Sequence, residues 1–327
     1  MKFIIISPPK TPNSIGCMFL YELAEEIQKL GFEAYRIILK QNQNGSFFVS
    51  TDEKRFILLE NDTLEKLVSP KNTIIIHGEN LHHKYFDKFK VARYYLNKIG
   101  ALKNIGVPRV DEFKVAWNSS YVDRPDFVLS RAKIKKPATK MIHFDQPRSI
   151  DLTYIGKGKL YNTQIGRLPG TIELTRSWPN NVDEYLLLLS KARFLFTYDV
   201  ISNVVTEAIA YGAVPVIMTY QPLANLQMLK NTYDPGVFKC CMLAEDFEKL
   251  DGDSLSSFFK QFRKDRKFVC DEFDRSNINF QQRLRDLLRA LLTRFGPSTL
   301  TTDCKNTDNQ ALNWYDNKKQ TVTNFGY

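Results

Sequence analysis

Apolar residues along this chain fall into short runs separated by polar loops and amphipathic stretches. Runs of four to six apolar residues bounded by turn residues are typical of buried strands in a parallel sheet. In the first half we expect such strands at residues 2–7, 32–39, 73–76, 113–117 and 127–129. Apolar residues recurring every three or four positions predict an amphipathic helix over 17–30 and a strongly basic helix over 81–97, and the polar run 40–50 predicts a loop or hairpin.

The same alternation starts again after a turn-rich segment at 145–149. We expect strands at 152–155, 171–174, 194–198, 214–218 and 237–240. Helices are expected at 182–192, 204–211, near 223–230 and at 277–294. Strands leading repeatedly into helices predict two Rossmann-like α/β domains. We place them at residues 1–148 and 149–296, with a polar tail at 297–327.

Residues 193–218 form the clearest βαβ unit of the chain. A strand ends just before Asp199, Ser202 and Asn203 are good helix N-caps, and Gly212 suits the C-cap. A helix N-terminus at the carboxyl end of a strand presents backbone N–H groups that favour phosphate. The pattern therefore predicts an anion-binding turn at Ser202, Asn203 and Val204.

Length and composition limit the number of domains and the cellular compartment that we expect. At 327 residues, two domains are expected, and no apolar run approaches the 18 residues of a membrane span. The first strand is followed at once by Pro8 and Pro9 rather than by the pattern of a signal peptide. The five cysteines are odd in number and lack C-x-x-C spacing, as in reduced proteins. We expect a cytoplasmic protein.

The net charge of +10 is concentrated in residues 84–140, where 14 Lys and Arg face 5 Asp and Glu. Such a region attracts nucleic acid, anionic lipid surfaces or phosphorylated substrates, and a solvated helix face fits equally well. Aromatic residues interleave with cations over 82–90, but helical spacing accounts for most of them as core. We expect peripheral contact with an anionic membrane at its inner face, rather than nucleic acid.

Common catalytic motifs are absent. The chain has no P-loop, dinucleotide-binding glycine motif, H-E-x-x-H or G-x-S-x-G, and its four histidines lack partners at metal-ligand spacing. Neither a metal nor a cofactor is therefore expected.

Charged residues at strand ends are the remaining candidates. Asp199 and Glu207 lie eight residues apart across the strand-to-helix turn of the βαβ unit. Lys157 and Lys159 lie on a glycine-bounded loop that follows a strand of the same half. Arg176 follows the neighbouring strand. Together they predict a crevice in which backbone N–H groups and cations bind a diphosphate and a carboxylate binds ribose hydroxyl groups.

In the N-terminal half, His77 and Glu79 follow a buried strand and are expected to face the cleft between the domains. Either could contact the acceptor or the donor sugar, and the sequence does not choose between them.

Three segments carry a more specific resemblance. They are Tyr154–Gly158, Glu173–Pro179, and Asp199 with Glu207 before the run Ala-Ile-Ala-Tyr-Gly-Ala-Val-Pro-Val. Over roughly residues 150–220 they resemble the donor half of retaining GT-B glycosyltransferases (group 1, family 4-like), which carry Glu-x7-Glu before Ala-x-Ala-x-Gly-x-Pro-Val. The resemblance implies an α/β GT-B fold, in which two Rossmann-like domains face each other across a cleft.

The resemblance also implies roles for single residues. Glu207 would bind the nucleotide ribose, Asp199 would lie near the donor sugar, Lys157 would contact the diphosphate, and the loop with Gly16 would approach the donor phosphates. Asp199 is one methylene shorter than the Glu of the family, and Val200 and Ile201 replace its glycines.

The implied activity is that of a hexosyltransferase-type glycosyltransferase. It would move a sugar from a UDP- or GDP-sugar to a glycan or lipid-linked acceptor in surface polysaccharide or glycoconjugate synthesis, with retention of configuration and without a metal. One alternative is a nucleotide-sugar epimerase of the same architecture, which would need further acid/base carboxylates in the cleft. Another is a non-enzymatic nucleic-acid-binding protein that uses residues 84–140.

Overall fold

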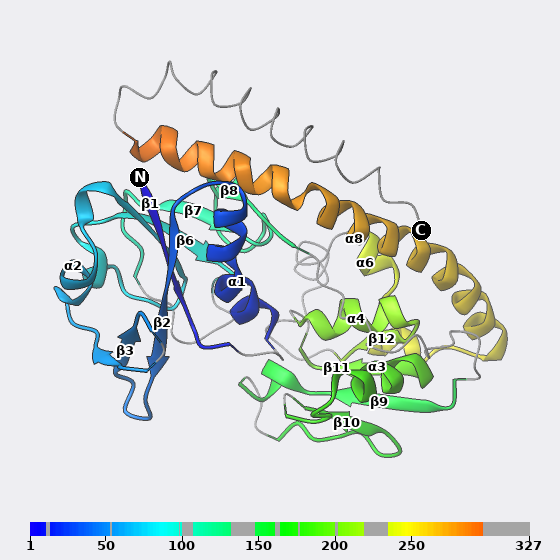
Figure 1. Cartoon of the computed structure of the whole chain (residues 1–327). Coiled ribbons are helices and arrows are strands. Elements are labelled where there is room, and N and C mark those ends of the chain that lie inside the picture. The colour runs from blue at the N-terminus through cyan, green and yellow to red at the C-terminus, as the bar shows by residue number, and fades with distance from the viewer. Residues whose placement is uncertain are drawn as a thin grey trace, which may run out of the picture.

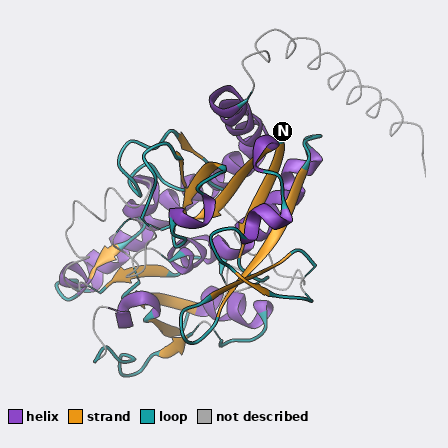
Figure 2. Cartoon of the chain, turned by 90° about the vertical axis from the view of Figure 1, so that its left-hand side faces the viewer, coloured by secondary structure: helices purple, strands orange, loops and turns teal. Residues whose placement is uncertain are grey.

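A computed structural model of the chain describes residues 1–10, 14–52, 54–97, 99, 107–131, 148–160, 164–175, 177–199, 202–218 and 235–296. The chain forms two α/β domains, each built on its own sheet, and one long helix runs across both (Figure 1). The view in Figure 2 shows the strands as two separate groups with helices packed around them. The predicted pair of Rossmann-like domains is confirmed.

The N-terminal sheet has eight strands in the order β4-β3-β2-β1-β5-β6-β7-β8. Their bounds are β1 (Lys2–Ser7), β2 (Ala34–Gln41), β3 (Phe47–Ser50), β4 (Ile57–Leu58), β5 (Thr73–Gly78), β6 (Lys90–Tyr95), β7 (Phe113–Ala116) and β8 (Phe127–Val128). All neighbours pair in parallel except β2 with β3 and β3 with β4, which are antiparallel. The hairpin expected at 40–50 is thus confirmed.

Side chains of this sheet alternate between two cores. Ile74 and Ile76 of β5 face a core with α1 (Ile15–Lys29), whereas Ile75 faces a second core on the other side. The second core is covered by α2 (Thr63–Leu67) and by the 3₁₀ turn η2 (His83–Phe86); a further 3₁₀ turn, η1 (Pro70–Asn72), precedes β5. Because both faces are covered, the strands read as continuous apolar runs.

The basic helix predicted over 81–97 is wrong. These residues form the short turn η2 and the strand β6, which pairs with β5 and β7. Val91 and Tyr94 of β6 face opposite cores, as alternation in a strand requires. Pairing on both sides therefore overrides the helical spacing of the aromatic residues.

The C-terminal sheet is parallel, with the order β10-β9-β11-β12-β13. Its strands are β9 (Ile150–Tyr154), β10 (Ile172–Leu174), β11 (Ala192–Thr197), β12 (Val214–Ile217) and β13 (Met242–Leu243). Its helices are η3 (Gly156–Leu160), α3 (Val182–Lys191), α4 (Asn203–Tyr211), α6 (Pro235–Lys239) and α7 (Ala244–Phe247).

The strand predicted at 237–240 is wrong, because this segment continues helix α6. Its buried residues, Val237 and Cys240, are three positions apart, which is helical spacing. The helix expected near 223–230 and the tail at 297–327 lie outside the described residues.

Helix α8 (Gly252–Phe295) is 44 residues long and belongs to both domains (gold to orange in Figure 1). Phe262 and Val269 in its first half are buried in the core of the C-terminal sheet. Phe280 and Leu288 in its second half are buried in the core between the N-terminal sheet and α1. The N-terminal core is thus completed by chain that follows the whole C-terminal sheet.

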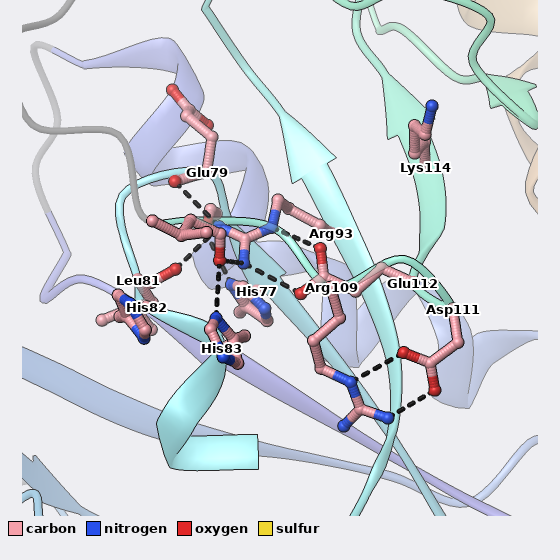
Figure 3. Close-up of polar contacts among 12 residues, drawn as sticks. His77, Glu79, Leu81, His82, His83, Arg93, Arg109, Asp111, Glu112 and Lys114 are labelled. Atoms are coloured by element: carbon pink, nitrogen blue, oxygen red, sulfur yellow. Dashed lines mark hydrogen bonds and ion pairs between the residues drawn. The ribbon is translucent and has the colours of Figure 1, made fainter. Parts of the chain in front are cut away.

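A fully buried arginine, Arg93 of β6, holds the loop that follows β5 (Figure 3). Its guanidinium makes two hydrogen bonds to the carboxylate of Glu112, at 2.7 and 2.9 Å. It also donates to the backbone carbonyl groups of Glu79, Leu81 and Val107, at 3.0, 2.7 and 3.1 Å. Charge balance and these hydrogen bonds compensate the cost of burying a guanidinium.

His77 is buried beside this arginine. Its ring stacks on Phe86 with centroids 4.3 Å apart, and its Nδ1 lies 2.7 Å from the carbonyl oxygen of Gly78. Burial, assisted by the charge of Arg93, lowers the pKa of His77 to about 3. The imidazole is therefore neutral in the native protein near pH 7.

Replacing Arg93 by Met should destabilise the protein strongly. Glu112 would remain as a buried charge without its partner, which typically costs about 3–5 kcal/mol. Urea denaturation measures the free energy of unfolding. Lys88→Met is the matched control, because the Lys88–Glu65 ion pair lies at the surface and its loss should change stability little. Equal effects of the two substitutions would contradict this account.

The pKa of His77 predicts acid sensitivity. Between about pH 6.5 and pH 3 the unfolded chain binds a proton on this residue that the folded chain does not, so stability falls as pH is lowered. The contribution approaches about 1.4 kcal/mol per pH unit. Denaturation curves of His77→Phe over this range should show a slope smaller by up to one proton. An unchanged slope would show that His77 titrates alike in the folded and unfolded states, contrary to the lowered pKa.

Candidate active site in the interdomain cleft

A cleft of about 950 Å³ lies between the two domains. Loops that follow β1, β5 and β7 line it on one side, loops that follow β9 and β11 line it on the other, and the middle of α8 contributes as well. The carboxyl ends of parallel strands are where open α/β sheets bind ligands. The structure brings eight of the predicted site residues into this cleft: Gly16, Glu79, Lys157, Asp199, Ser202, Asn203, Val204 and Glu207.

Three other predicted residues are not among those that line it. His77 points instead into the second core of the N-terminal sheet, where it packs on Phe86. His77 lies within β5 on the same face of the sheet as Ile75, so its side chain is covered by that core instead of extending past the end of the strand. The expectation that His77 faces the cleft is therefore wrong. Lys159 is exposed on η3, and Arg176 lies outside the described residues.

Helix α4 begins at the cleft. Ser202 caps it by accepting a hydrogen bond from the Val204 N–H at 3.3 Å, and Gly212 ends it in the left-handed conformation at φ 83°. Of the predicted caps, Ser202 and Gly212 are confirmed, whereas Asn203 is the first residue of the helix. Ser202, Asn203 and Val204 line the cleft, so the positive end of the helix dipole is directed at it.

Glu207 lies one helical turn beyond Asn203 and so shares its face of α4. Its side chain is buried, with 2% exposure, and lines the cleft. The Tyr185 hydroxyl of α3 donates to its Oε2 at 2.6 Å. Burial raises the pKa of Tyr185 well above its usual value, and the nearby charge of Glu207 raises it further. Glu207 is thus a carboxylate fixed in position, not a solvent-facing helix residue.

Asp199 is held at the end of β11 by the loop that follows β9. The backbone N–H of Lys157 donates to its Oδ2 at 2.9 Å, and its side chain is 3% exposed. Gly156 makes this approach possible because its φ is +51° and a Cβ there would lie 2.5 Å from the Asp199 Oδ2. Lys157 therefore orients Asp199 through its backbone, in addition to lining the cleft with its side chain.

On the N-terminal side of the cleft, the Glu79 side chain links the segment after β5 to the segment after β6. Its Oε2 accepts from the Leu96 N–H at 3.1 Å, and its Oε1 accepts from the Asn97 side-chain amide at 2.6 Å. Burial raises the pKa of Tyr121, to which the charges of Asp199 and Glu79 add. Both carboxylates therefore act on this phenol.

Sequence reasoning missed two groups of cleft residues. Trp117 and Tyr121 follow β7; Trp117 was expected only to end a strand, and nothing was predicted for Tyr121. Arg275, Ser276 and Asn279 come from α8, for which the prediction covered only residues 277–294. The signal for the second group is a gap in the apolar pattern: α8 buries Val269 and then Phe280, with a polar stretch between them.

Two further features of the described residues concern metal binding and membrane insertion. No group of three or more His, Cys, Asp or Glu side chains there is arranged to hold a metal ion. None of the helices in that part of the chain is long and apolar enough to cross a membrane.

No protein-family model and no curated protein sequence matches this chain. Among solved structures it is similar to the spinosyn rhamnosyltransferase SpnG complexed with thymidine diphosphate, at 10% identity and TM-score 0.38, over 89% of this chain and 100% of that one. It is also similar to MurG of Acinetobacter baumannii, at 10% identity and TM-score 0.42, over 88% and 99%. A third is an alpha-glucosyltransferase in complex with UDP and a 13-mer DNA, at 11% identity and TM-score 0.39, over 89% and 99%. The fold itself, two Rossmann-like domains facing each other across a cleft, is evident from the sheets and cleft of this chain.

Proposed function

We propose that the protein is a glycosyltransferase that moves a sugar from a nucleotide-sugar donor to a glycan or lipid-linked acceptor. The observation that carries this proposal is the buried Glu207–Tyr185 pair, which lies in the cleft one helical turn from the N-terminus of α4. A helix N-terminus favours phosphate, and a fixed carboxylate beside it accepts hydrogen bonds from ribose hydroxyl groups. Nucleotides, including nucleotide sugars, carry both of these groups.

The donor lies on the C-terminal side of the cleft in this proposal. Its diphosphate binds the first turn of α4 and the Lys157 ammonium, and its ribose binds Glu207. The sugar extends toward Asp199, which the Lys157 N–H holds in place. UDP- and GDP-sugars are the donors to test first.

Sugar transfer requires that the negative charge developing on the leaving diphosphate be stabilised in the transition state. The bond between the anomeric carbon and the diphosphate oxygen breaks, and its electron pair leaves with the phosphate. The α4 dipole and Lys157 stabilise that charge, so the step can proceed without a divalent metal. The acceptor hydroxyl oxygen then bonds the anomeric carbon from the same face and passes its proton to the departing phosphate. Configuration is retained in this scheme.

An epimerase of the same architecture is the competing chemistry, because it needs cleft carboxylates that exchange protons with the sugar. Glu79 and Asp199 are candidates by position, but each accepts a hydrogen bond from a backbone N–H group. These bonds fix the orientation of each carboxylate and occupy one of its oxygens. We therefore favour a role in positioning over proton exchange with the sugar, and hence transfer over epimerisation.

Glu207→Gln should weaken nucleotide binding by tenfold or more. The amide keeps the size of the carboxylate but loses the charge that strengthens hydrogen bonds to ribose. Calorimetric titration with UDP, GDP, CMP and ADP sugars measures the effect and identifies the nucleotide. Glu184→Gln is the matched control, since Glu184 is exposed on α3. Unchanged affinity and turnover in folded Glu207→Gln would refute the site. Consumption of donor to its epimer without an acceptor, followed by proton NMR, would instead establish an epimerase.

Gly156→Ala should abolish transfer by displacing Asp199. The added Cβ would meet the Asp199 carboxylate, and the left-handed backbone at this residue costs about 1–2 kcal/mol for alanine. Gly166→Ala is the control, because nothing lies within 4 Å of a Cβ placed there. Release of nucleoside diphosphate in the presence of acceptor measures turnover, and circular dichroism verifies folding. Equal turnover of the two variants would contradict a role for Asp199.

A further inference from the structure

The outer side of α8 carries a row of residues that belongs to neither of the cores that this helix completes. Figure 1 shows the helix running along the outside of both domains. Six exposed residues follow one another at spacings of four, three, four, three and four positions, which places them on one face of the helix. We call this row the α8 seam: Lys260, Lys264, Lys267, Asp271, Asp274 and Ile278.

The charges of the α8 seam are not used within the described part of the chain. There, no ion pair and no side-chain hydrogen bond involves any of its five charged side chains. Lys267 and Asp271 are four positions apart, but a cation that precedes the anion is the less favourable order for an ion pair within a helix. These charges are therefore available to a partner.

The seam does not have a single sign, and this limits what the partner can be. Three lysines occupy its first half, whereas two aspartates and an isoleucine occupy its second half. A lipid bilayer of anionic composition or a nucleic acid is negative throughout, so it would be attracted by one half and repelled by the other. A matching partner must carry both signs, in the opposite order along its length.

A second copy of α8 has that order when it lies antiparallel. Pairs of positions that are symmetric about residue 269 carry complementary side chains: Lys264 with Asp274, Lys267 with Asp271, and Lys260 with Ile278. Two antiparallel copies therefore place each aspartate opposite a lysine, and each isoleucine opposite the apolar stem of a lysine. Such a contact has twofold symmetry, in which the same patch serves both copies.

An exposed aromatic ring lies beside the symmetry point. Phe268 flanks the seam and is 54% exposed, and Ile278 at one end of the seam is 78% exposed. In the antiparallel arrangement the two copies of Phe268 meet near the twofold axis, so apolar surface is removed from water there. Exposed ion pairs add little affinity, but they set the direction and register of the contact.

We propose that the α8 seam binds the same seam of a second copy of this chain, antiparallel and about a twofold axis beside residue 269. The seam is about 27 Å long at 1.5 Å per residue, which is short for an interface, so the dimer is reversible and salt-dependent. The contact lies outside the cleft residues of α8, Ser276 and Asn279 among them. It does not depend on the proposed glycosyltransferase function.

Sedimentation-velocity ultracentrifugation of the full chain tests the proposal. At low salt the protein should shift from monomer to dimer as its concentration is raised to several hundred micromolar. High salt should raise the dissociation constant at least tenfold, because it screens the exposed charges. A monomer at every concentration at low salt would overturn the proposal.

Charge reversal tests the antiparallel pairing itself. Lys264→Asp combined with Lys267→Asp makes the central part of the seam negative, and Asp271→Lys combined with Asp274→Lys makes it positive. Each double variant alone should stay monomeric because like charges then face each other, whereas an equimolar mixture of the two should form a heterodimer. Circular dichroism verifies that both are folded. A dimer of either variant alone, or a mixture that stays monomeric, would contradict the pairing.

Two further variants complete the test. Phe268→Ala should raise the dissociation constant by tenfold or more, and an unchanged constant would contradict a contact at the twofold axis. Lys54→Asp combined with Lys71→Asp is the matched control, because both lysines are exposed on the N-terminal domain and the net charge changes equally. This control should dimerise as the unmodified chain does, and its failure to do so would show that net charge, not the seam, governs association.

Cosedimentation with phosphatidylglycerol vesicles tests a different occupant of the seam. The unmodified chain should bind them no more tightly than the variant with Lys264→Asp and Lys267→Asp. Vesicle binding that this variant loses, by a protein that is monomeric without vesicles, would assign the seam to a lipid surface and refute the dimer.

Discussion

The packing of one helix on two cores is the constraint on which the cleft depends. The described part of α8 buries Phe262 and Val269 against the C-terminal sheet and Phe280 and Leu288 against the N-terminal one, without a break in the helix. A continuous helix resists bending, because its hydrogen bonds must be broken to kink it. The separation of the two sheets is therefore set by the number of residues between these two apolar segments. The same stretch is free of core contacts on one side, which allows Arg275, Ser276 and Asn279 to line the cleft.

The two sides of the cleft present different chemical groups to a ligand. The C-terminal side has a helix N-terminus, a lysine and buried carboxylates, a combination suited to a ligand that carries both phosphate and ribose. The N-terminal side has amides and aromatic rings beside the Glu79 carboxylate, which already accepts hydrogen bonds from the Leu96 N–H and the Asn97 side-chain amide. Arg93 makes this possible from behind, since it neutralises Glu112 and holds the carbonyl oxygen of Glu79 in place. Because that buried charge is fully hydrogen-bonded, the loop it supports is ordered before any ligand arrives.

The C-terminal part of the site was largely predictable from the sequence, and the N-terminal part was not. Asp199, Ser202 and Glu207 lie on one contiguous strand–turn–helix unit, where local rules of capping and periodicity fix which residues share a face. The lining on the N-terminal side of the cleft comes from the ends of separate strands, so its composition depends on how those strands pair. The segment 81–97 shows the limit, because its aromatic spacing fitted a helix, yet pairing with two neighbours made β6. His77 of β5 likewise faces the second core and not the cleft. Helix α8 reaches the cleft through long-range packing, which no local pattern reports.

Asp199 shows how a departure from an expected motif can be explained by its neighbours. The resemblance expects a glutamate there, but Gly156 approaches so closely that even one added carbon at its Cα would lie 2.5 Å from the Asp199 Oδ2. The carboxylate reaches the Lys157 N–H at 2.9 Å from this short distance, and a side chain longer by one methylene would have to displace the loop. The shorter acid and the left-handed glycine are therefore one structural unit. In the proposed glycosyltransferase this unit would lie beside the donor sugar, so the geometry of the pair, and not the identity of the acid alone, would shape the sugar pocket.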